Sequence, residues 1–180
     1  MIFNRDDEAE KELNIGSKLD PENASIHYNL GIIYMNRKEY DKAQKEFETS
    51  IKYDSSFAMG VEGMGVLFFN KGDYKKAKEK FITALNINSE LLNSRYKLGV
   101  IYMMDNDYNN AQKQLEIIAN TVVKNSFRSD VYTRLAQIYV SREQYEKAET
   151  YSNMALAIDS DNIEARNNLS AVYMQYDLNW

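Results

Sequence analysis

The sequence predicts an all-α solenoid, in which short antiparallel helix pairs follow one another along the chain. The chain has 180 residues, of which one is proline and seven are glycine, so few residues would interrupt helices. Apolar residues recur at helical spacing, first at Leu30 and Tyr34 and then at Ala43, Phe47 and Ile51. The pattern also returns at a fixed interval, which is typical of arrays of small helical units.

The interval is 34 residues over most of the chain. It relates three glycines, three tyrosines and three alanines: Gly31, Gly65 and Gly99; Tyr40, Tyr74 and Tyr108; Ala43, Ala77 and Ala111. The next unit is displaced by three residues, since Leu135 lies 37 residues after Leu98. We therefore expect one array made of a half repeat at 6–23, repeats at 24–57, 58–91, 92–128 (with the three-residue insertion) and 129–162, and a terminal helix at 163–180.

Each unit reads as two helices separated by a short polar break. The breaks within units are NRKEYD, NKGDYK, MDNDYN and SREQYE, and the breaks between units carry Ser, Asp and Asn, which favour helix ends and N-caps. We expect helices near residues 6–19, 24–37, 40–53, 58–71, 74–87, 92–105, 108–123, 129–142, 145–158 and 163–176. The three extra residues should lengthen the helix at 108–123 or the segment KNSFRS that follows it.

The repeated pattern resembles the tetratricopeptide repeat (TPR) family, whose 34-residue helix pair carries L-G-x-x-Y, then A-x-x-x-F, then P. The matching residues are Leu30, Gly31, Tyr34, Ala43, Phe47, Gly65, Ala77, Phe81, Leu98, Gly99, Tyr102, Ala111, Leu135, Tyr139 and Ala148. The chain departs from the pattern at the terminal proline, which survives only as Pro21, and at the tryptophan position, which holds His27, Val61, Arg95, Tyr132 and Arg166. The resemblance implies a right-handed superhelix of antiparallel helix pairs.

The resemblance also implies protein–protein recognition, without catalysis, along a concave face formed by the first helix of each unit. The residues expected to bind a partner protein or peptide there are Tyr28, Asn29, Ile32, Met35, Glu62, Gly63, Val66, Phe69, Asn70, Tyr96, Lys97, Val100, Met103, Arg134, Gln137 and Asn168. Gly63 should leave a dent without a side chain in that face. Apolar residues at helical spacing also mark cores, so many of these residues could instead be half-buried between helices.

The family branch that binds chaperone tails uses a basic, Asn-rich clamp. Glu62, Val66 and Asp130 stand where that clamp requires Lys or Asn, so chaperone tails are not the expected ligands. Lys97 and Arg134, by contrast, hold the same position in consecutive units and should lie side by side. They would receive a ligand carboxylate, or they would be neutralised within the face by Glu62, Asp130 or Glu164.

Composition limits the kinds of partner and the cellular location that we expect. The net charge is −5 and no run of Lys and Arg forms a basic stripe, so nucleic acid is not an expected partner. No apolar run approaches the length of a membrane span, and MIFNRDDEAE lacks the apolar segment of a signal peptide. With no cysteine, disulfides and thiolate metal sites are excluded. A cytoplasmic protein that does not insert into membranes is the expectation.

Three motifs suggest chemistry, and none is complete. MGVEGMGVLFF has clustered glycines but no preceding strand, so it does not predict a phosphate loop. DNDYNNAQKQLE follows the calcium-loop spacing but has Asn110 where the sharp turn requires glycine. His27 is the only histidine, and no G-x-S-x-G motif accompanies it. We expect no enzyme activity, metal or cofactor.

The alternative to a binding scaffold is a structural array that self-assembles as a homo-oligomer through its end helices, where Tyr176, Leu178 and Trp180 add apolar surface.

Overall fold

The computed structural model describes residues 2–121 and 124–178, and within them it confirms the all-α prediction. Its helices are α1 (Ile2–Leu19), α2 (Ala24–Asn36), α3 (Tyr40–Tyr53), α4 (Ala58–Asn70), α5 (Tyr74–Ile87), α6 (Leu92–Met104), α7 (Tyr108–Ala119), α8 (Asn125–Ser141), α9 (Tyr145–Ile158) and α10 (Ile163–Leu178). No strand occurs in the described part of the chain.

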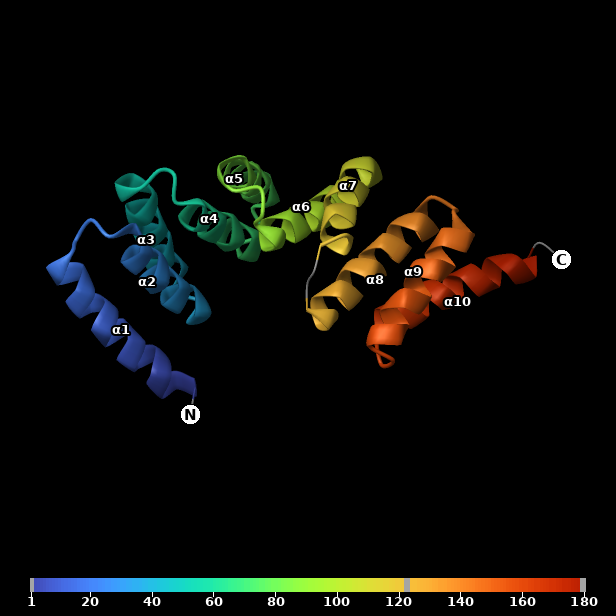
Figure 1. The fold of residues 1–180 in the computed structure, drawn as a ribbon, viewed down its shortest axis with the longest axis horizontal. Coiled ribbons are helices and arrows are strands. Elements are labelled where there is room, and N and C mark those ends of the chain that lie inside the picture. Colours follow the sequence, from blue (N-terminus) through green and yellow to red (C-terminus); the bar gives the residue numbers. More distant parts are fainter. Residues whose placement is uncertain (1, 122–123, 179–180) are drawn as a thin grey trace. The chain divides into compact units, whose positions relative to one another are not determined.

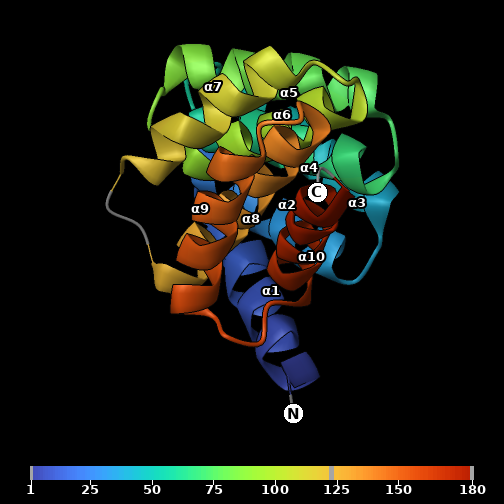
Figure 2. The same ribbon diagram turned by 90° about the vertical axis from the view of Figure 1, so that its right-hand side faces the viewer.

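The chain divides into two compact units, Met1–Ser94 and Arg95–Trp180, called unit 1 and unit 2 below. In unit 1, α2 packs against α3 and α4 against α5, and α1 lies beside α2 (Figure 1). In unit 2, α8 packs against α7 and α9, and α10 lies against both α8 and α9 (Figure 2). Helices that are consecutive in the chain therefore form the pairs that the repeat predicts.

The repeat positions explain the core. The alanine that is the fourth residue of each second helix is fully buried, and so is the residue four positions later: Ala43 and Phe47, Ala77 and Phe81, Ala111 and Leu115, Ala148 and Ser152. Small residues on the first helices, such as Gly31 and Gly65, face these side chains and allow the two helices to approach closely.

Turns and caps follow the local sequence. The turn inside each complete repeat contains one residue with positive φ: Lys38 (61°), Gly72 (79°), Asn106 (58°) and Glu143 (58°). Asp73 and Asp107 then cap the following helices, because their carboxylates accept the backbone N–H of Lys76 and Asn110, each at 3.2 Å. Asp107 is thus a helix cap in the segment whose spacing resembles a calcium loop.

The three extra residues before Ser129 were expected to lengthen α7 or the segment KNSFRS after it, and the structure shows neither. α7 ends at Ala119, with Asn120 as its C-cap, and α8 begins at Asn125, so α8 has gained its first turn and α7 is not lengthened. The Thr121 N–H donates to the Ile118 carbonyl at 2.9 Å, and its Oγ1 donates to the Ile117 carbonyl at 2.8 Å. Thr121 is β-branched, which also disfavours continued helix. Part of the expected helix end, 122–123, lies outside the described residues.

Candidate functional site

The expected binding residues of unit 1 lie on α2 and α4, and several of them are packing residues. Tyr28, Ile32 and Met35 pack against the core cluster of Ala43, Phe47, Met64 and Leu67. The Tyr28 ring lies 5.7 Å from that of Phe57, edge to face. Burial, and secondarily the charge of Glu62, raises the pKa of Tyr28. On this face the half-buried alternative describes Tyr28, Ile32 and Met35.

Further along unit 1, polar and aromatic side chains have intramolecular partners. Ser94 donates its hydroxyl to Glu62 at 2.7 Å. Phe69 meets the ring of Tyr74 edge to face at 5.3 Å, across the turn between α4 and α5. Val66 is half-buried, whereas Asn29 and Asn70 are exposed. Asn29 and Asn70 are therefore the exposed members of the set expected in unit 1.

The expected dent at Gly63 is absent, and that prediction was wrong. Gly63 is buried, and a Cβ atom added there would lie 2.6 Å from the ring of Phe47. Gly31 on α2 lies against the same ring, and a Cβ atom added there would also lie 2.6 Å from it. Phe47 therefore lies between two glycines, one on its own first helix and one on the next, and Gly63 is unavailable to a ligand.

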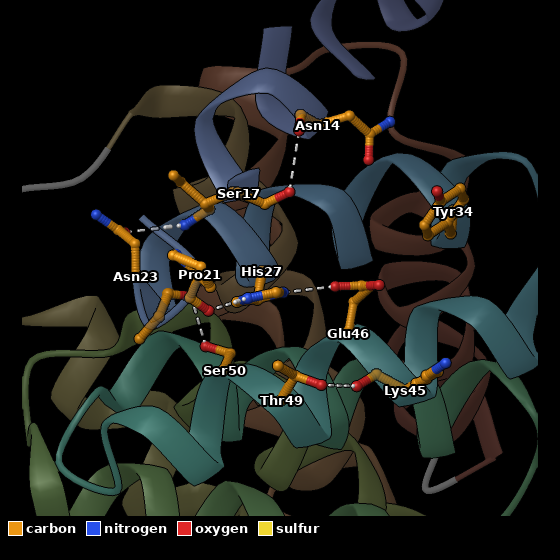
Figure 3. A network of polar contacts seen from close by, with 12 residues as sticks. Asn14, Ser17, Pro21, Asn23, His27, Tyr34, Lys45, Glu46, Thr49 and Ser50 are labelled. Carbon is orange, nitrogen blue, oxygen red and sulfur yellow. Dashed lines mark hydrogen bonds and ion pairs between the residues drawn. The ribbon is translucent and has the colours of Figure 1, made fainter. Parts of the chain in front are cut away.

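His27 has the packing role that its repeat position suggests. Its Nδ1 lies 2.7 Å from Glu46 Oε2 on α3, and its Nε2 lies 2.9 Å from the Pro21 carbonyl (Figure 3). The ring also stacks on Tyr53 at 5.7 Å. The imidazole thus joins the turn before α2 to the second helix of the same repeat, and both ring nitrogens are engaged there.

Unit 2 contains two adjoining pockets on opposite sides of one stretch of α8. The first, the α6–α8 pocket, has a volume of about 290 Å³ and is lined by Val100, Met103, Met104, Tyr108, Arg134, Gln137 and Ser141. The second, the α8–α10 pocket, has a volume of about 230 Å³ and is lined by Arg134, Gln137, Glu164, Asn167 and Asn168. Arg134 and Gln137 line both pockets, so a ligand in one would contact the side chains that border the other.

Arg134 is held by hydrogen bonds and by one carboxylate. Its NH1 lies 3.2 Å from Glu164 Oε2 and donates to Gln137 Oε1 at 3.2 Å. Burial disfavours its charge, but the hydrogen bond with Tyr96 and the charges of Glu164 and Asp130 outweigh this, so the pKa of Arg134 is raised. Glu164 therefore forms an ion pair with Arg134 within the face. Neutralisation of Lys97 by a carboxylate stays a prediction.

The neighbouring titratable groups are shifted mainly by burial. Burial lowers the pKa of Lys97 and raises the pKa of Asp130, although the charge of Arg134 partly offsets the second shift. Lys97 is half-buried and Asp130 is exposed. Removing water from either group makes its charged form costlier. The side-by-side placement of Lys97 and Arg134 stays a prediction.

The pockets contain five of the residues expected from the sequence: Val100, Met103, Arg134, Gln137 and Asn168. Sequence reasoning missed Tyr108 and Ser141 as pocket residues. Tyr108 opens a second helix, and its recurrence at Tyr40, Tyr74 and Tyr145 was the signal that this position lies close to the turn and to the first-helix face. Tyr96, another expected binding residue, packs its ring edge to face against that of Phe127, with 5.3 Å between the ring centroids.

The described residues also bear on metal binding and on membrane insertion. Among residues 2–121 and 124–178, no group of three or more His, Cys, Asp or Glu side chains is arranged to hold a metal ion. In the same residues, no helix combines the length and apolar character needed to cross a membrane.

Comparison with known proteins places these helix pairs in a family. Residues 24–57 and 129–162 each match a family model described as a tetratricopeptide repeat. A search of curated proteins finds no match to the sequence.

Solved structures share the fold over most of the chain. YrrB, described as a TPR protein with an unusual peptide-binding site, is similar with a TM-score of 0.81 and 19% identity, over 92% of this chain and 84% of its own. MamA from Desulfovibrio magneticus RS-1 is similar with a TM-score of 0.75 and 20% identity, over 86% of this chain and 85% of its own. Pseudomonas aeruginosa PilF is similar with a TM-score of 0.74 and 18% identity, over 86% of this chain and 69% of its own. Residues 24–57 and 129–162 are therefore tetratricopeptide repeats, and the chain has the all-α solenoid fold of these solved structures.

Proposed function

We propose that this protein is a non-catalytic interaction scaffold, and that unit 2 binds an extended segment of a partner protein across α8. The observation that carries the proposal is the pair of pockets that share Arg134 and Gln137. Adjoining pockets of different polarity suit a chain in which neighbouring side chains differ in character.

The α6–α8 pocket is suited to an apolar side chain. Val100, Met103 and Met104 supply its apolar wall, and Met104 is 52% exposed. Methionine is flexible and polarisable, so it adapts its shape to different apolar groups. Removing these surfaces from water would provide the main favourable free energy of binding.

The α8–α10 pocket is suited to polar backbone and to an acidic group. Gln137 and Asn167 carry amides, which both donate and accept hydrogen bonds and can pair with a peptide backbone. Glu164, the carboxylate paired with Arg134, is 61% exposed, so it can move into solvent at little cost. A ligand carboxylate could then take its place and pair with Arg134 through two hydrogen bonds.

Similarity of fold supports a binding function of this kind. YrrB, the similar structure described above, has a peptide-binding site, and repeat arrays generally use their extended faces for recognition. The ligand we propose for this chain is a segment with an apolar residue close in sequence to Asp, Glu or a terminal carboxylate.

The experiment is selection of a displayed random peptide library on the purified chain, followed by fluorescence anisotropy with one selected peptide. We expect Met104→Ala and Arg134→Ala each to raise the dissociation constant by roughly tenfold. Arg134→Ala should also reduce the salt dependence of binding, because it removes a charge pair.

A matched control comes from α9. Met154 is 39% exposed and lines neither pocket, so Met154→Ala should leave the affinity unchanged. If the Met154 variant loses as much affinity as the Met104 variant, or if neither pocket variant loses affinity, binding occurs elsewhere and the proposal fails.

A further inference from the structure

A basic residue ends the first helix in three of the four complete repeats and reaches back to the second helix before it. Each of these residues is the C-cap of its helix: Arg37 after α2, Lys71 after α4 and Arg142 after α8. In unit 1 both cations meet carboxylates. The Arg37 guanidinium lies 2.6 Å from Asp7 and 2.5 Å from Glu10, both on α1. The Lys71 ammonium lies 3.9 Å from Asp41 on α3.

Arg142 keeps this arrangement but has amides where Arg37 has carboxylates. Asn109 and Gln112 on α7 lie three repeats after Asp7 and Glu10, so they hold the same two positions. Arg142 donates from NH1 to Gln112 Oε1 at 2.6 Å and from NH2 to Asn109 Oδ1. Amide oxygens accept hydrogen bonds but carry no net charge. The residues that replace the two acids therefore do not neutralise Arg142.

A lysine on α9 shows the same exchange. Lys147 Nζ lies 5.3 Å from the centre of the Tyr139 ring, just as its equivalent Lys42 lies over the equivalent ring in unit 1. Lys42 pairs with Glu39, whereas the residue equivalent to Glu39 is Gln144. Three carboxylates around the cations of unit 1 are thus three amides around the cations of unit 2.

The amides that bind Arg142 also line an open groove along α7, called the α7 groove below. Its volume is about 470 Å³, and its lining residues follow helical spacing: Asn109, Gln112, Lys113, Glu116, Ile117 and Asn120. Lys113 is exposed, and Ile117 is 38% exposed. A ligand in the α7 groove would therefore meet a further cation and an apolar side chain beside the amides.

The acids close to these cations are engaged by other groups. Glu116 accepts hydrogen bonds from Gln112 at 2.7 Å and from the Tyr139 hydroxyl at 3.3 Å. Glu143, which follows Arg142 in the chain, is exposed and lines a different pocket. Within residues 2–121 and 124–178, no carboxylate forms an ion pair with the cations of this cluster: Arg142, Lys113 and Lys147.

We propose that the α7 groove binds the carboxylate side chains of an acidic segment of a partner protein. Arg142 has more N–H donors than its two amide partners use, so it can pair with a carboxylate that enters from solvent. Lys113 and Lys147 add charge at the same place. The Arg37 cluster shows that carboxylates suit this arrangement of groups, and Ile117 favours an apolar residue next to the acid.

This site is separate from the α6–α8 and α8–α10 pockets. None of the residues that line those two pockets lines the α7 groove. The inference therefore does not depend on the proposed function, and either one can fail without the other.

An NMR titration of the ¹⁵N-labelled chain with tetraglutamate tests the inference at low ionic strength, where charge pairs are least screened. The side-chain amide signals of Asn109 and Gln112 should move together and saturate, with a dissociation constant of about 1 mM. Tetraglutamine has the same length without the charge, so it should leave these signals in place.

Asn109→Asp copies the Asp7–Arg37 ion pair into unit 2. The new carboxylate would compete with the ligand for Arg142 and repel it, so the dissociation constant for tetraglutamate should rise at least about fivefold, measured at Gln112. Asn153→Asp is the matched control. Asn153 is exposed on α9 and does not line the α7 groove, so this variant should bind within about twofold of the wild type.

Four results would overturn the inference. The first is no saturating shift up to about 10 mM tetraglutamate, and the second is an equal shift with tetraglutamine. The third is an Asn109→Asp variant that binds like the wild type. The fourth is saturation by inorganic phosphate, titrated in parallel, with no response to tetraglutamate. Spectra without any peptide complete the test, because a Gln112 signal that moves with protein concentration would assign the groove to a second copy instead of a partner.

Discussion

At the crossing point of each helix pair, a small first-helix residue faces one side chain of the second helix. A Cβ atom added at Gly65 would lie 2.7 Å from the ring of Phe81, whereas one added at Gly99 would lie 3.1 Å from Cγ of Leu115. In the fourth repeat the equivalent positions hold Ser152 and Ala136, and both are fully buried. The size of the second-helix residue thus sets how small its partner must be, since a packed interior has little spare volume.

This relation predicts different costs for the same substitution. Gly65→Ala should lower the free energy of unfolding by about 1–3 kcal/mol, because the Phe81 ring is rigid and buried. Gly99→Ala should be close to neutral, because Leu115 can shift and alanine gains roughly 1 kcal/mol of helix propensity. Urea unfolding, with an unchanged m-value, measures both. Equal losses at the two sites would contradict the relation, and Phe81→Leu should recover part of the loss in the Gly65 variant.

Among the elements, α1 is attached to α2 and its C-cap Arg37 through two carboxylates, those of Asp7 and Glu10. Glu10 accepts hydrogen bonds from Arg37, and from Tyr34 at 2.8 Å. These hydrogen bonds, Arg37 first, hold the pKa of Glu10 below its ordinary value of 4.5. Burial, and then the bond to Glu10, raises the pKa of Tyr34 to about 12. Each shift means that the folded state favours ionised Glu10 and neutral Tyr34.

The stabilisation from Glu10 is present above pH 4.5 and is lost as the pH falls through its lowered pKa. Glu10→Gln should therefore unfold at a lower temperature than wild type at pH 7, and the difference should shrink as the pH falls below about 4. Thermal unfolding followed by circular dichroism at several pH values measures the difference. A gap that stays constant with pH would show that the ionised form of Glu10 does not hold α1.

The elements also show what sequence alone could predict. The expected bounds of α2 to α6 and of α9 agree with the structure to within one residue, because the repeat fixes the turn, the alanine and the cap together. The repeat gave no such guide at the insertion. There, the choice between extending α7 and extending α8 depended on how Thr121 closes α7, which is a local balance of propensity and hydrogen bonding.

For the molecule as a whole, the position of the candidate site was partly predictable. Repeat positions placed Val100, Met103, Arg134, Gln137 and Asn168 on one face, and these residues line the two pockets. They did not show that Gly63 is covered by Phe47, or that Glu62 is bonded to Ser94. Those outcomes depend on the side chains of neighbouring repeats, so a residue's position within its own repeat does not reveal them.

The most direct test of the proposed function uses the eight methionines of the chain as probes. Methyl NMR spectra of methionine-labelled protein should be recorded during titration with a peptide selected on the full chain. The α6–α8 pocket predicts that the signals of Met103 and Met104 move together and saturate, while those of Met59 and Met154 stay in place. Saturating shifts at Met59 or Met154, with Met103 and Met104 unmoved, would contradict binding across α8.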